Sequence, residues 1–205
     1  MIDYATSYPE KLLYPLLEHI EMLIITLVLS LLLASALTII SIYSRALSKV
    51  LVYASSVIYS ISSLAMFALL IPLTGLGKTT AIIVLVVYNQ YLLLRNFTEG
   101  LNEVDPAIVE AATGLGMSKL QLLFKIKIPL SKKAIFTGVR LAVVSTIGIA
   151  TIAAFINAGG LGSILFDGLR TMNTVKIVWG SILAAGLAIV TNAILSKIEQ
   201  RMKTF

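Results

Sequence analysis

The residues that could support chemistry are few, and none of them belongs to a complete catalytic pattern. His19 is the only histidine of the chain and lies between Glu18 and Glu21, a set too small for a convincing metal site, so we expect an ordinary surface histidine. The chain has no cysteine, which excludes disulfides, thiol catalysis, zinc–cysteine sites and iron–sulfur clusters. The sequence therefore predicts no catalytic residue, metal site or cofactor on this chain.

One segment ends like a phosphate-binding loop, with the residues Gly75-Leu-Gly77-Lys78-Thr79-Thr80. That motif requires a glycine five residues before Gly77, where this chain has Pro72. No buried strand precedes the segment either. We therefore expect no nucleotide site here.

The composition is typical of a membrane protein. Of the 205 residues, 58% are hydrophobic and 13% are charged, and the mean hydropathy is +0.97. Soluble domains are usually about a quarter charged. The net charge of +6 comes from basic residues in short loops without an aromatic-interleaved basic face, so nucleic-acid binding is not expected. Residues 1–21 are acidic overall, which does not fit a cleavable signal peptide.

Five apolar stretches approach the length of about 20 residues that a membrane helix needs. They predict an all-α, polytopic protein that forms a single membrane domain over residues 1–205. The expected spans are about 19–43, 50–73, 79–94, 134–158 and 176–196.

Basic residues are distributed unevenly between the two sides of these spans. Twelve of them fall in the loops after the first and third spans and in the C-terminal tail, and four fall on the other side. Because Lys and Arg collect in cytoplasmic loops, the N-terminus is expected outside and the C-terminus inside. The protein is expected in the cytoplasmic membrane of a prokaryote.

Polar side chains within the spans are candidates for a translocation path. Intramembrane polar groups tend to face an interior or a cavity, although they also serve as contacts between helices. Apart from Glu21, Arg140 and Lys176, which we take as end residues, the spans contain no Asp, Glu, Lys or Arg, which argues against a stand-alone secondary carrier with an ionisable relay. The candidates are Asn89, Gln90, Ser145, Thr146 and Asn157.

A long polar loop, about 95–133, interrupts the apolar chain. Asp105 is a good N-cap, Pro106 suits the first helical position, and Gly114 and Gly116 supply a stop, so a short helix is expected over 106–113. Its spacing predicts an apolar ridge with small residues at the centre, formed by Ile108, Ala111, Ala112 and Leu115.

Two more short helices are expected in the same loop. Ser118 can cap one that runs over 119–128 and ends at Pro129, and Ser131 can cap another that leads into the fourth span. Such an elbow is stiff and can transmit force. Its apolar tip suits a groove on another protein.

This loop resembles the cytoplasmic signature of the permeases of binding-protein-dependent ABC importers. That signature reads Glu-Ala-Ala, three residues, Gly, nine residues, Ile, one residue and Leu-Pro. The chain matches every interval, and Ile128 replaces the usual leucine. The matching residues are Glu110, Ala111, Ala112, Gly116, Ile126, Ile128 and Pro129.

The resemblance implies that the short helix is a coupling helix that sits in a cleft of a separate ATPase subunit. It further implies two ATPase subunits that bind ATP and Mg, a second permease copy or a paralogue, and an external substrate-binding protein. Glu110, Ala111, Ala112 and Gly116 would be the coupling residues. Gly116 is expected to allow a positive φ or a close backbone contact.

Two further stretches resemble the osmoprotectant permeases, which import glycine betaine, carnitine, choline or proline betaine. They are Thr137-Gly138-Val139-Arg140-Leu-Ala and the glycine-rich segment 157–169. Methionine-type permeases share the five-span plan and remain an alternative. The glycines Gly159, Gly160 and Gly162 allow a tight turn, after which 164–166 could dip as a short helix and form an outer gate or a docking surface. A plain flexible loop is the other interpretation.

The substrate cannot be read from the sequence. Quaternary ammonium groups are held in aromatic cages, but aromatic residues in spans more often serve packing or interfacial anchoring. A secondary carrier and a membrane enzyme remain as rival functions, the latter without any catalytic constellation. The aromatic candidates in the second and third spans are Tyr53, Tyr59, Phe67, Tyr88 and Tyr91.

Overall fold

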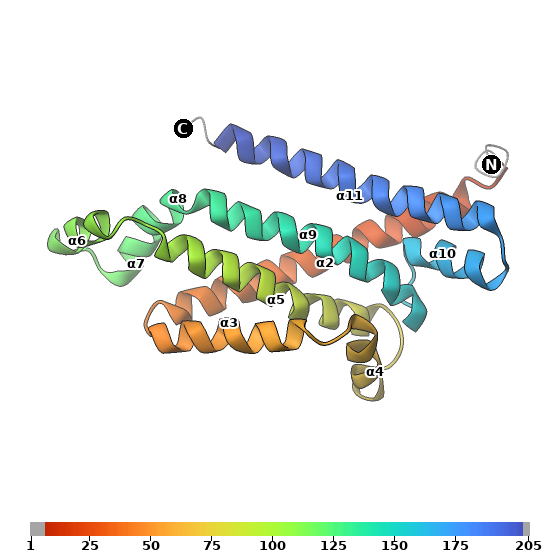
Figure 1. Cartoon of the computed structure of the whole chain (residues 1–205), viewed down its shortest axis with the longest axis horizontal. Coiled ribbons are helices and arrows are strands. Elements are labelled where there is room, and N and C mark those ends of the chain that lie inside the picture. The colour runs from red at the N-terminus through yellow and green to blue at the C-terminus, as the bar shows by residue number, and fades with distance from the viewer. Residues whose placement is uncertain (1–6, 203–205) are drawn as a thin grey trace.

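The computed structural model describes residues 7–202, and every regular element in that range is a helix (Figure 1). This confirms the predicted all-α class. The long elements are α2 (Glu10–Ser41), α3 (Arg45–Tyr59), α4 (Ser63–Thr74), α5 (Lys78–Asn102), α9 (Lys132–Ala153) and α11 (Thr174–Met202). The short elements are α6 (Pro106–Gly114), α7 (Lys119–Leu122), a π-helical turn (Leu123–Lys127), α8 (Ile128–Leu130), a 3-10 turn (Ala154–Ile156) and α10 (Leu161–Arg170).

Among residues 7–202, four helices are long and apolar enough to cross a membrane, namely α2, α5, α9 with its 3-10 extension, and α11, and the bent pair of α3 and α4 would make a fifth if it is one span. The four helices overlap the first, third, fourth and fifth predicted spans and are longer than most of them. The first helix begins at Glu10, well before residue 19, and the third continues to Asn102, well beyond residue 94. Polar ends therefore extend these helices past their apolar cores.

The second predicted span, 50–73, is not one straight helix. It is divided into α3 and α4, whose axes differ by 97°. Ser56 and Ser60 each bond a carbonyl three residues earlier, and such back-bonding competes with the helix and bends it. The Tyr88 hydroxyl then donates to the Ile61 carbonyl at 2.6 Å and satisfies a backbone group that the break leaves free. Serine back-bonding and the bond from the Tyr88 hydroxyl thus meet at the break.

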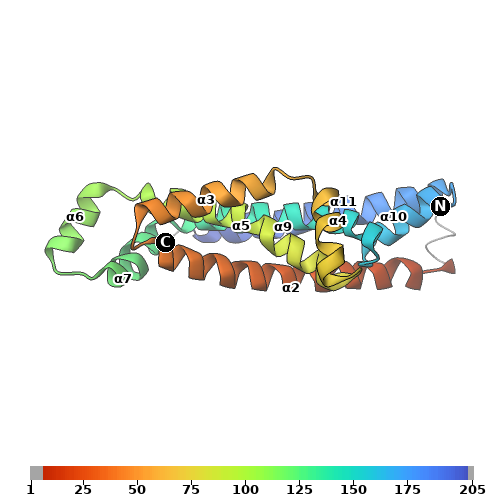
Figure 2. The same cartoon turned by 90° about the horizontal axis from the view of Figure 1, so that it is seen from below.

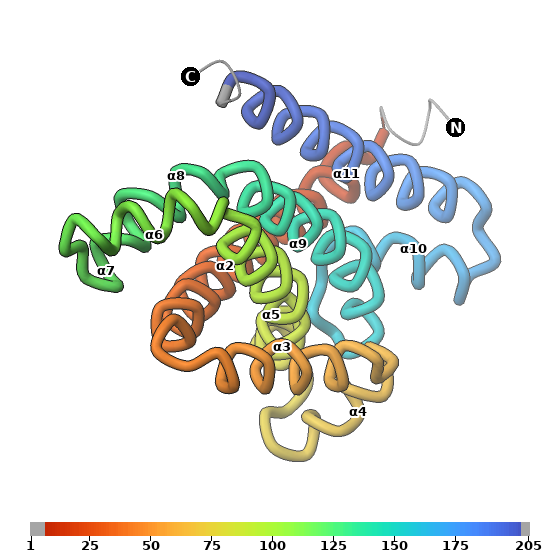
Figure 3. Tube along the Cα trace, turned by 60° about the vertical axis from the view of Figure 1, so that its left-hand side comes forward, coloured from red at the N-terminus to blue at the C-terminus, as the bar shows by residue number. Residues whose placement is uncertain are grey.

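The centre of the bundle is formed by α5 and α9, with α2 packed against both, and α3 and α11 lie on opposite sides (Figures 2 and 3). Buried residues recur every four positions along one face of α2, and all but the first of them are small, so that face lies close to its neighbours. These residues are Met22, Thr26, Ser30, Ala34 and Thr38.

The outer helix α11 is the least buried of the four straight candidate spans. An ion pair attaches its last turns to α9, because Arg140 Nη1 lies 3.2 Å from Glu199 Oε2 and 3.1 Å from Ser196 Oγ. Glu199 is buried, with 8% of its surface exposed. This polar contact thus adds to the packing of α11 against α9 and α10.

The bundle has two distinct ends (Figure 1). The α6 end carries α6, α7, α8 and the turn between α2 and α3, whereas the α10 end carries α10 and the link between α4 and α5. The predicted basic loops lie at the α6 end, and Lys203 of the predicted basic tail lies outside the described residues. The assignment of the α6 end to the cytoplasm stays a prediction.

Candidate functional site

The start of α6 is built as the sequence predicts. The Asp105 carboxylate accepts a hydrogen bond from the Ala107 N–H at 2.8 Å, and Pro106 occupies the first helical position, where its missing N–H costs nothing. The helix covers Pro106–Gly114, one residue more than expected. Local chemistry alone therefore specifies this element.

The end of α6 explains why position 116 is a glycine. Gly116 has φ +81°, its N–H bonds the Thr113 carbonyl, and the N–H of Met117 bonds the Ala112 carbonyl. This pair of bonds is the Schellman ending, which needs a left-handed residue. No atom of the chain lies within 4 Å of where a Cβ would be, so conformation and not crowding favours glycine. The predicted positive φ is confirmed.

The predicted apolar ridge of α6 is only partly presented to the outside. Ala112 turns toward the chain itself and is 5% exposed, which corrects its place at the centre of the exposed ridge. Ala111 and Glu110 are exposed, as are Ile108 and, most of all, Leu115, which is 82% exposed. A surface with both apolar groups and a carboxylate is thus available at the tip of the loop.

The second helix of the loop differs from the prediction. Ser118 forms a full capping box with Gln121, as expected from its position. The helix does not run evenly over 119–128, because α7 widens into the π-helical turn that contains Ile126 and continues through Pro129 as α8. The wider turn accommodates a proline that would otherwise clash with the preceding turn. Ile126 is half-buried and Pro129 is exposed.

The base of the loop is closed by Ser131. The prediction that its side chain caps α9 is wrong. The hydroxyl instead donates to the Gly100 carbonyl at 2.6 Å in a buried position. A Cβ on Gly100 would collide with that of Ala134, and one on Gly138 would lie 2.8 Å from that of Asn96. Glycine therefore lets α5 and α9 approach closely just below the loop. Displacement of the loop must move both central helices.

Three of the predicted path residues meet in the interior of the bundle. Asn89 Nδ2 donates to Ser30 Oγ at 3.2 Å and to Thr146 Oγ1 at 2.9 Å, which joins α5 to α2 and α9. Gln90 donates to the Ser30 carbonyl at 3.3 Å, while its buried Oε1 has no partner within the described residues. The residues of this cluster come from three helices that are far apart in the sequence. Sequence analysis missed Ser30, although its place in the four-residue spacing along α2 could have identified it.

The other two predicted path residues lie elsewhere. Ser145 is half-buried and its hydroxyl is 3.5 Å from that of Tyr59. Asn157 is exposed at the α10 end, with a left-handed backbone of φ 63°. The five residues therefore do not form one continuous group in this chain.

The glycine-rich outer segment forms a tight turn that leads into α10. Gly159 and Gly160 have φ values of +79° and +75°, and a Cβ on Gly160 would lie 2.9 Å from His19 Nδ1. The N–H of Gly160 donates to Glu18 Oε2 at 3.0 Å, and that of Leu161 donates to His19 Nδ1 at 3.3 Å. These bonds satisfy free N–H groups at the start of α10.

The expectation of a surface histidine is therefore wrong, since His19 is completely buried. The link between α4 and α5, which resembles a phosphate loop, packs against the same region. The Gly77 N–H bonds the Ile156 carbonyl, and Lys78 lies 3.0 Å from Glu21 and 3.8 Å from Glu18.

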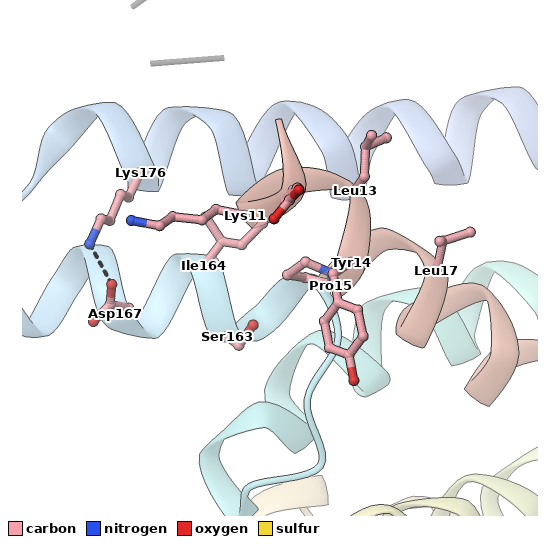
Figure 4. Close-up of a pocket in the computed structure, with 10 residues that line it drawn as sticks. Lys11, Leu13, Tyr14, Pro15, Leu17, Ser163, Ile164, Asp167 and Lys176 are labelled. Carbon is pink, nitrogen blue, oxygen red and sulfur yellow. Dashed lines mark hydrogen bonds and ion pairs between the residues drawn. The ribbon is translucent and has the colours of Figure 1, made fainter. Parts of the chain in front are cut away.

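A pocket of about 800 Å³ lies beside α10 (Figure 4). The first turns of α2 face α10 and α11 across it, and the Lys11 side chain points toward the side where Lys176 and Asp167 lie. Lys176 Nζ is 2.5 Å from Asp167 Oδ2, and this hydrogen bond holds the pKa of Asp167 below its ordinary value. The remaining lining residues are mostly apolar, such as Ile164, with Glu10 and Ser163 among them.

The aromatic candidates divide into three groups. Tyr59 lies 5.6 Å from Tyr88 and 5.0 Å from Tyr91, measured between ring centroids. Phe67 is fully buried in the core beside them, and Tyr53 is 72% exposed on α3.

Comparison with known families decides the class of the protein. The family described as "Binding-protein-dependent transport system inner membrane component" matches residues 26–204, nearly the whole described chain. The chain belongs to this family. It is thus a multi-pass protein of the cytoplasmic membrane and a transport subunit.

Members of this permease family that resemble the chain include transporters of quaternary ammonium compounds. The choline transport system permease protein OpuBB of Bacillus subtilis (strain 168) is 32% identical over 98% of this chain and 93% of its own length. The carnitine transport permease protein OpuCB of Listeria monocytogenes is 40% identical over 72% of this chain and 67% of its own length.

The permease fold is also seen in solved structures. One chain of the MetNI methionine ABC transporter, in inward-facing conformations, aligns with a TM-score of 0.84 and 17% identity. The alignment covers 93% of this chain and 95% of that one. The likeness extends the permease assignment to the fold of the whole bundle.

Proposed function

We propose that this chain is the permease subunit of an ATP-driven importer of osmoprotectants such as glycine betaine, carnitine or choline. The observation that carries the proposal is the exposed, doubly capped helix α6, which presents Glu110, Ala111 and Leu115 on a stiff loop. A short helix with small residues at its surface can dock closely in a groove of another protein. An ATPase subunit is the proposed partner of this docking surface.

The loop is built to transmit movement into the bundle. The Ser131–Gly100 hydrogen bond closes its base, and the glycine contacts at Gly100 and Gly138 leave little freedom between α5 and α9. A push on α6 would therefore shift the two helices that hold Asn89 and Thr146. Alternating access would follow when ATP binding and release move two such subunits relative to each other.

The partners follow from this arrangement. We propose two ATPase subunits that carry ATP and Mg, a second copy or a paralogue of this permease, and an external substrate-binding protein at the α10 end. The structured turn at Gly159 and Gly160 and the pocket beside Asp167 give that end a defined shape for docking or gating. The permease itself performs no covalent chemistry.

The substrate class is supported by the relatives, which are named for choline and carnitine. A methionine-type substrate is the second candidate, favoured only by the likeness of fold to the methionine transporter. Uptake of labelled glycine betaine, carnitine, choline and methionine, with and without this subunit, separates the two. Methionine uptake without any betaine, carnitine or choline uptake would overturn the osmoprotectant assignment.

The docking surface is tested by Leu115→Glu, because that side chain is 82% exposed and its replacement leaves the fold of this chain intact. We expect the ATPase to be lost when the variant is purified in mild detergent. Leu76→Glu is the matched control, since Leu76 is 66% exposed at the opposite end. Retention of the ATPase by Leu115→Glu, or equal loss with Leu76→Glu, would contradict the proposed interface.

A further inference from the structure

Two tyrosine rings at the break in the second span are accessible from outside the chain. Tyr88 is 3% exposed and belongs to the core, whereas Tyr59 and Tyr91 are half-buried and stack on each other at 5.0 Å with an angle of 36°. Tyr88, whose ring centroid lies 5.6 Å from that of Tyr59, donates its hydroxyl to the Ile61 carbonyl at the break. In many secondary transporters, discontinuous helices near the middle of the membrane form the substrate site, and this break is a comparable place to look for one here.

The ring pair already has a cation beside it. The guanidinium carbon of Arg95 lies 6.0 Å from the centroid of Tyr91, and Arg95 Nη1 donates to the Tyr91 hydroxyl at 2.9 Å. The face of an aromatic ring carries negative electrostatic potential and attracts cations. The Tyr91 ring therefore already stabilises one positive group, the Arg95 guanidinium.

The Arg95 guanidinium has donors to spare. It carries about five N–H groups, of which one bonds Glu99 at 3.0 Å and one bonds Tyr91, and no other partner lies among residues 7–202. The side chain is 52% exposed, so the remaining donors are accessible. A free guanidinium edge is a strong, geometrically matched receptor for a carboxylate.

We propose that Tyr59, Tyr91 and Arg95 form a transient binding site for a zwitterion that joins a quaternary ammonium group to a carboxylate. The ammonium group would lie against the two rings and the carboxylate against the free edge of Arg95. This inference rests on the proposed osmoprotectant function and places a selective site in the permease itself. Such a site would favour betaine and carnitine over choline. Betaine and carnitine carry a carboxylate that Arg95 can bind, whereas choline has only the cation, which Arg95 repels.

The test is uptake by the complete transporter, with its ATPase and external binding protein, in ATP-loaded proteoliposomes. Labelled glycine betaine and labelled choline are measured separately at saturating binding protein. We expect Arg95→Gln to lower the rate for betaine about fivefold or more, the scale of a lost charge-assisted contact, and to leave choline unchanged or faster. Glu99→Gln is the matched control, since it removes the ion pair but keeps the guanidinium, and it should preserve the ratio of the two rates.

The rings are tested in the same assay by a pair of substitutions at Tyr59. Tyr59→Phe keeps the aromatic face and should retain uptake of both substrates, while Tyr59→Leu should slow both, with the melting temperature as the measure of folding. Equal slowing of betaine and choline by Arg95→Gln, or equal rates in Tyr59→Leu and Tyr59→Phe, would overturn the site. A wild type that takes up neither substrate would instead refute the osmoprotectant function, and one that takes up only choline would refute the role of Arg95.

Discussion

The buried imidazole of His19 accepts a hydrogen bond from the backbone N–H of Leu161, with His19 Nδ1 and the Leu161 nitrogen 3.3 Å apart. The neighbouring Glu18 carboxylate accepts the Gly160 N–H in the same way. These two amides begin α10. The side chains of Glu18 and His19 on α2 therefore position α10. Of the two carboxylates and the histidine that could be mistaken for a weak metal site, Glu18 and His19 thus cap α10, whereas Glu21 pairs with Lys78.

Replacement of His19 by leucine should destabilise the protein. It keeps the volume but leaves the buried Leu161 N–H without an acceptor, which costs about 1–3 kcal/mol. His19→Asn is the control, because the amide oxygen of asparagine can accept at the position of Nδ1. Thermal unfolding in detergent should show a clearly lower melting temperature for the leucine variant, and equal losses in both would contradict the capping role.

Gly162 should not tolerate even one added methyl group. A Cβ there would collide with the Thr151 carbonyl and lie 2.7 Å from the Ala154 Cβ, so Gly162→Ala should cost about 1–3 kcal/mol or more by overpacking. The matched change Gly186→Ala meets nothing within 4 Å and should be neutral or stabilising. Melting temperatures of the two variants decide the matter, and similar values would show that α10 does not pack on α9 this closely.

Local signals were enough to predict the helices from the sequence. Apolar length identified the long helices, and the Asp105, Pro106 and Gly116 signals placed α6 within one residue, because a cap and a left-handed ending act through the nearest few residues. The break after Tyr59 could not be predicted in this way. It depends on a tertiary bond from Tyr88 to the Ile61 carbonyl, and composition alone described this stretch as a continuous span.

Side-chain roles that depend on distant partners were harder to predict. Ser131 occupies the expected capping position but bonds the Gly100 carbonyl, 31 residues earlier in the chain. His19 is buried because α10, 142 residues later, covers it. Asn89 and Thr146 were both predicted as path residues, but their contact was not predicted. Whether they touch depends on how each helix is rotated about its axis, which the sequence does not specify.

The link between α10 and α11 should weaken in acid. The Lys176 hydrogen bond lowers the pKa of Asp167 in the folded protein below the ordinary value of about 3.9. The stabilisation by the Asp167–Lys176 ion pair is therefore fully present above the pKa that Asp167 has in the unfolded chain. It is lost as the pH falls through the lower pKa that Asp167 has in the folded protein. The melting-temperature difference between wild type and Asp167→Asn should be constant from pH 7 to about 5 and should shrink below about 4. A difference that stayed constant down to about pH 3 would show that the ion pair does not contribute.

The Arg140–Glu199 pair should hold α11 against the bundle. Glu199→Gln or Arg140→Gln leaves the partner charge in a poorly hydrated position, and each should cost about 1–3 kcal/mol, reduced by the partial exposure of Arg140. The double variant removes both charges, so it should lose less than the two single losses combined. Thermal unfolding measures the cycle, and limited proteolysis should cut the end of α11 faster in the single variants. Additive losses would indicate that the two side chains act independently and that their ion pair does not hold the end of α11 against α9.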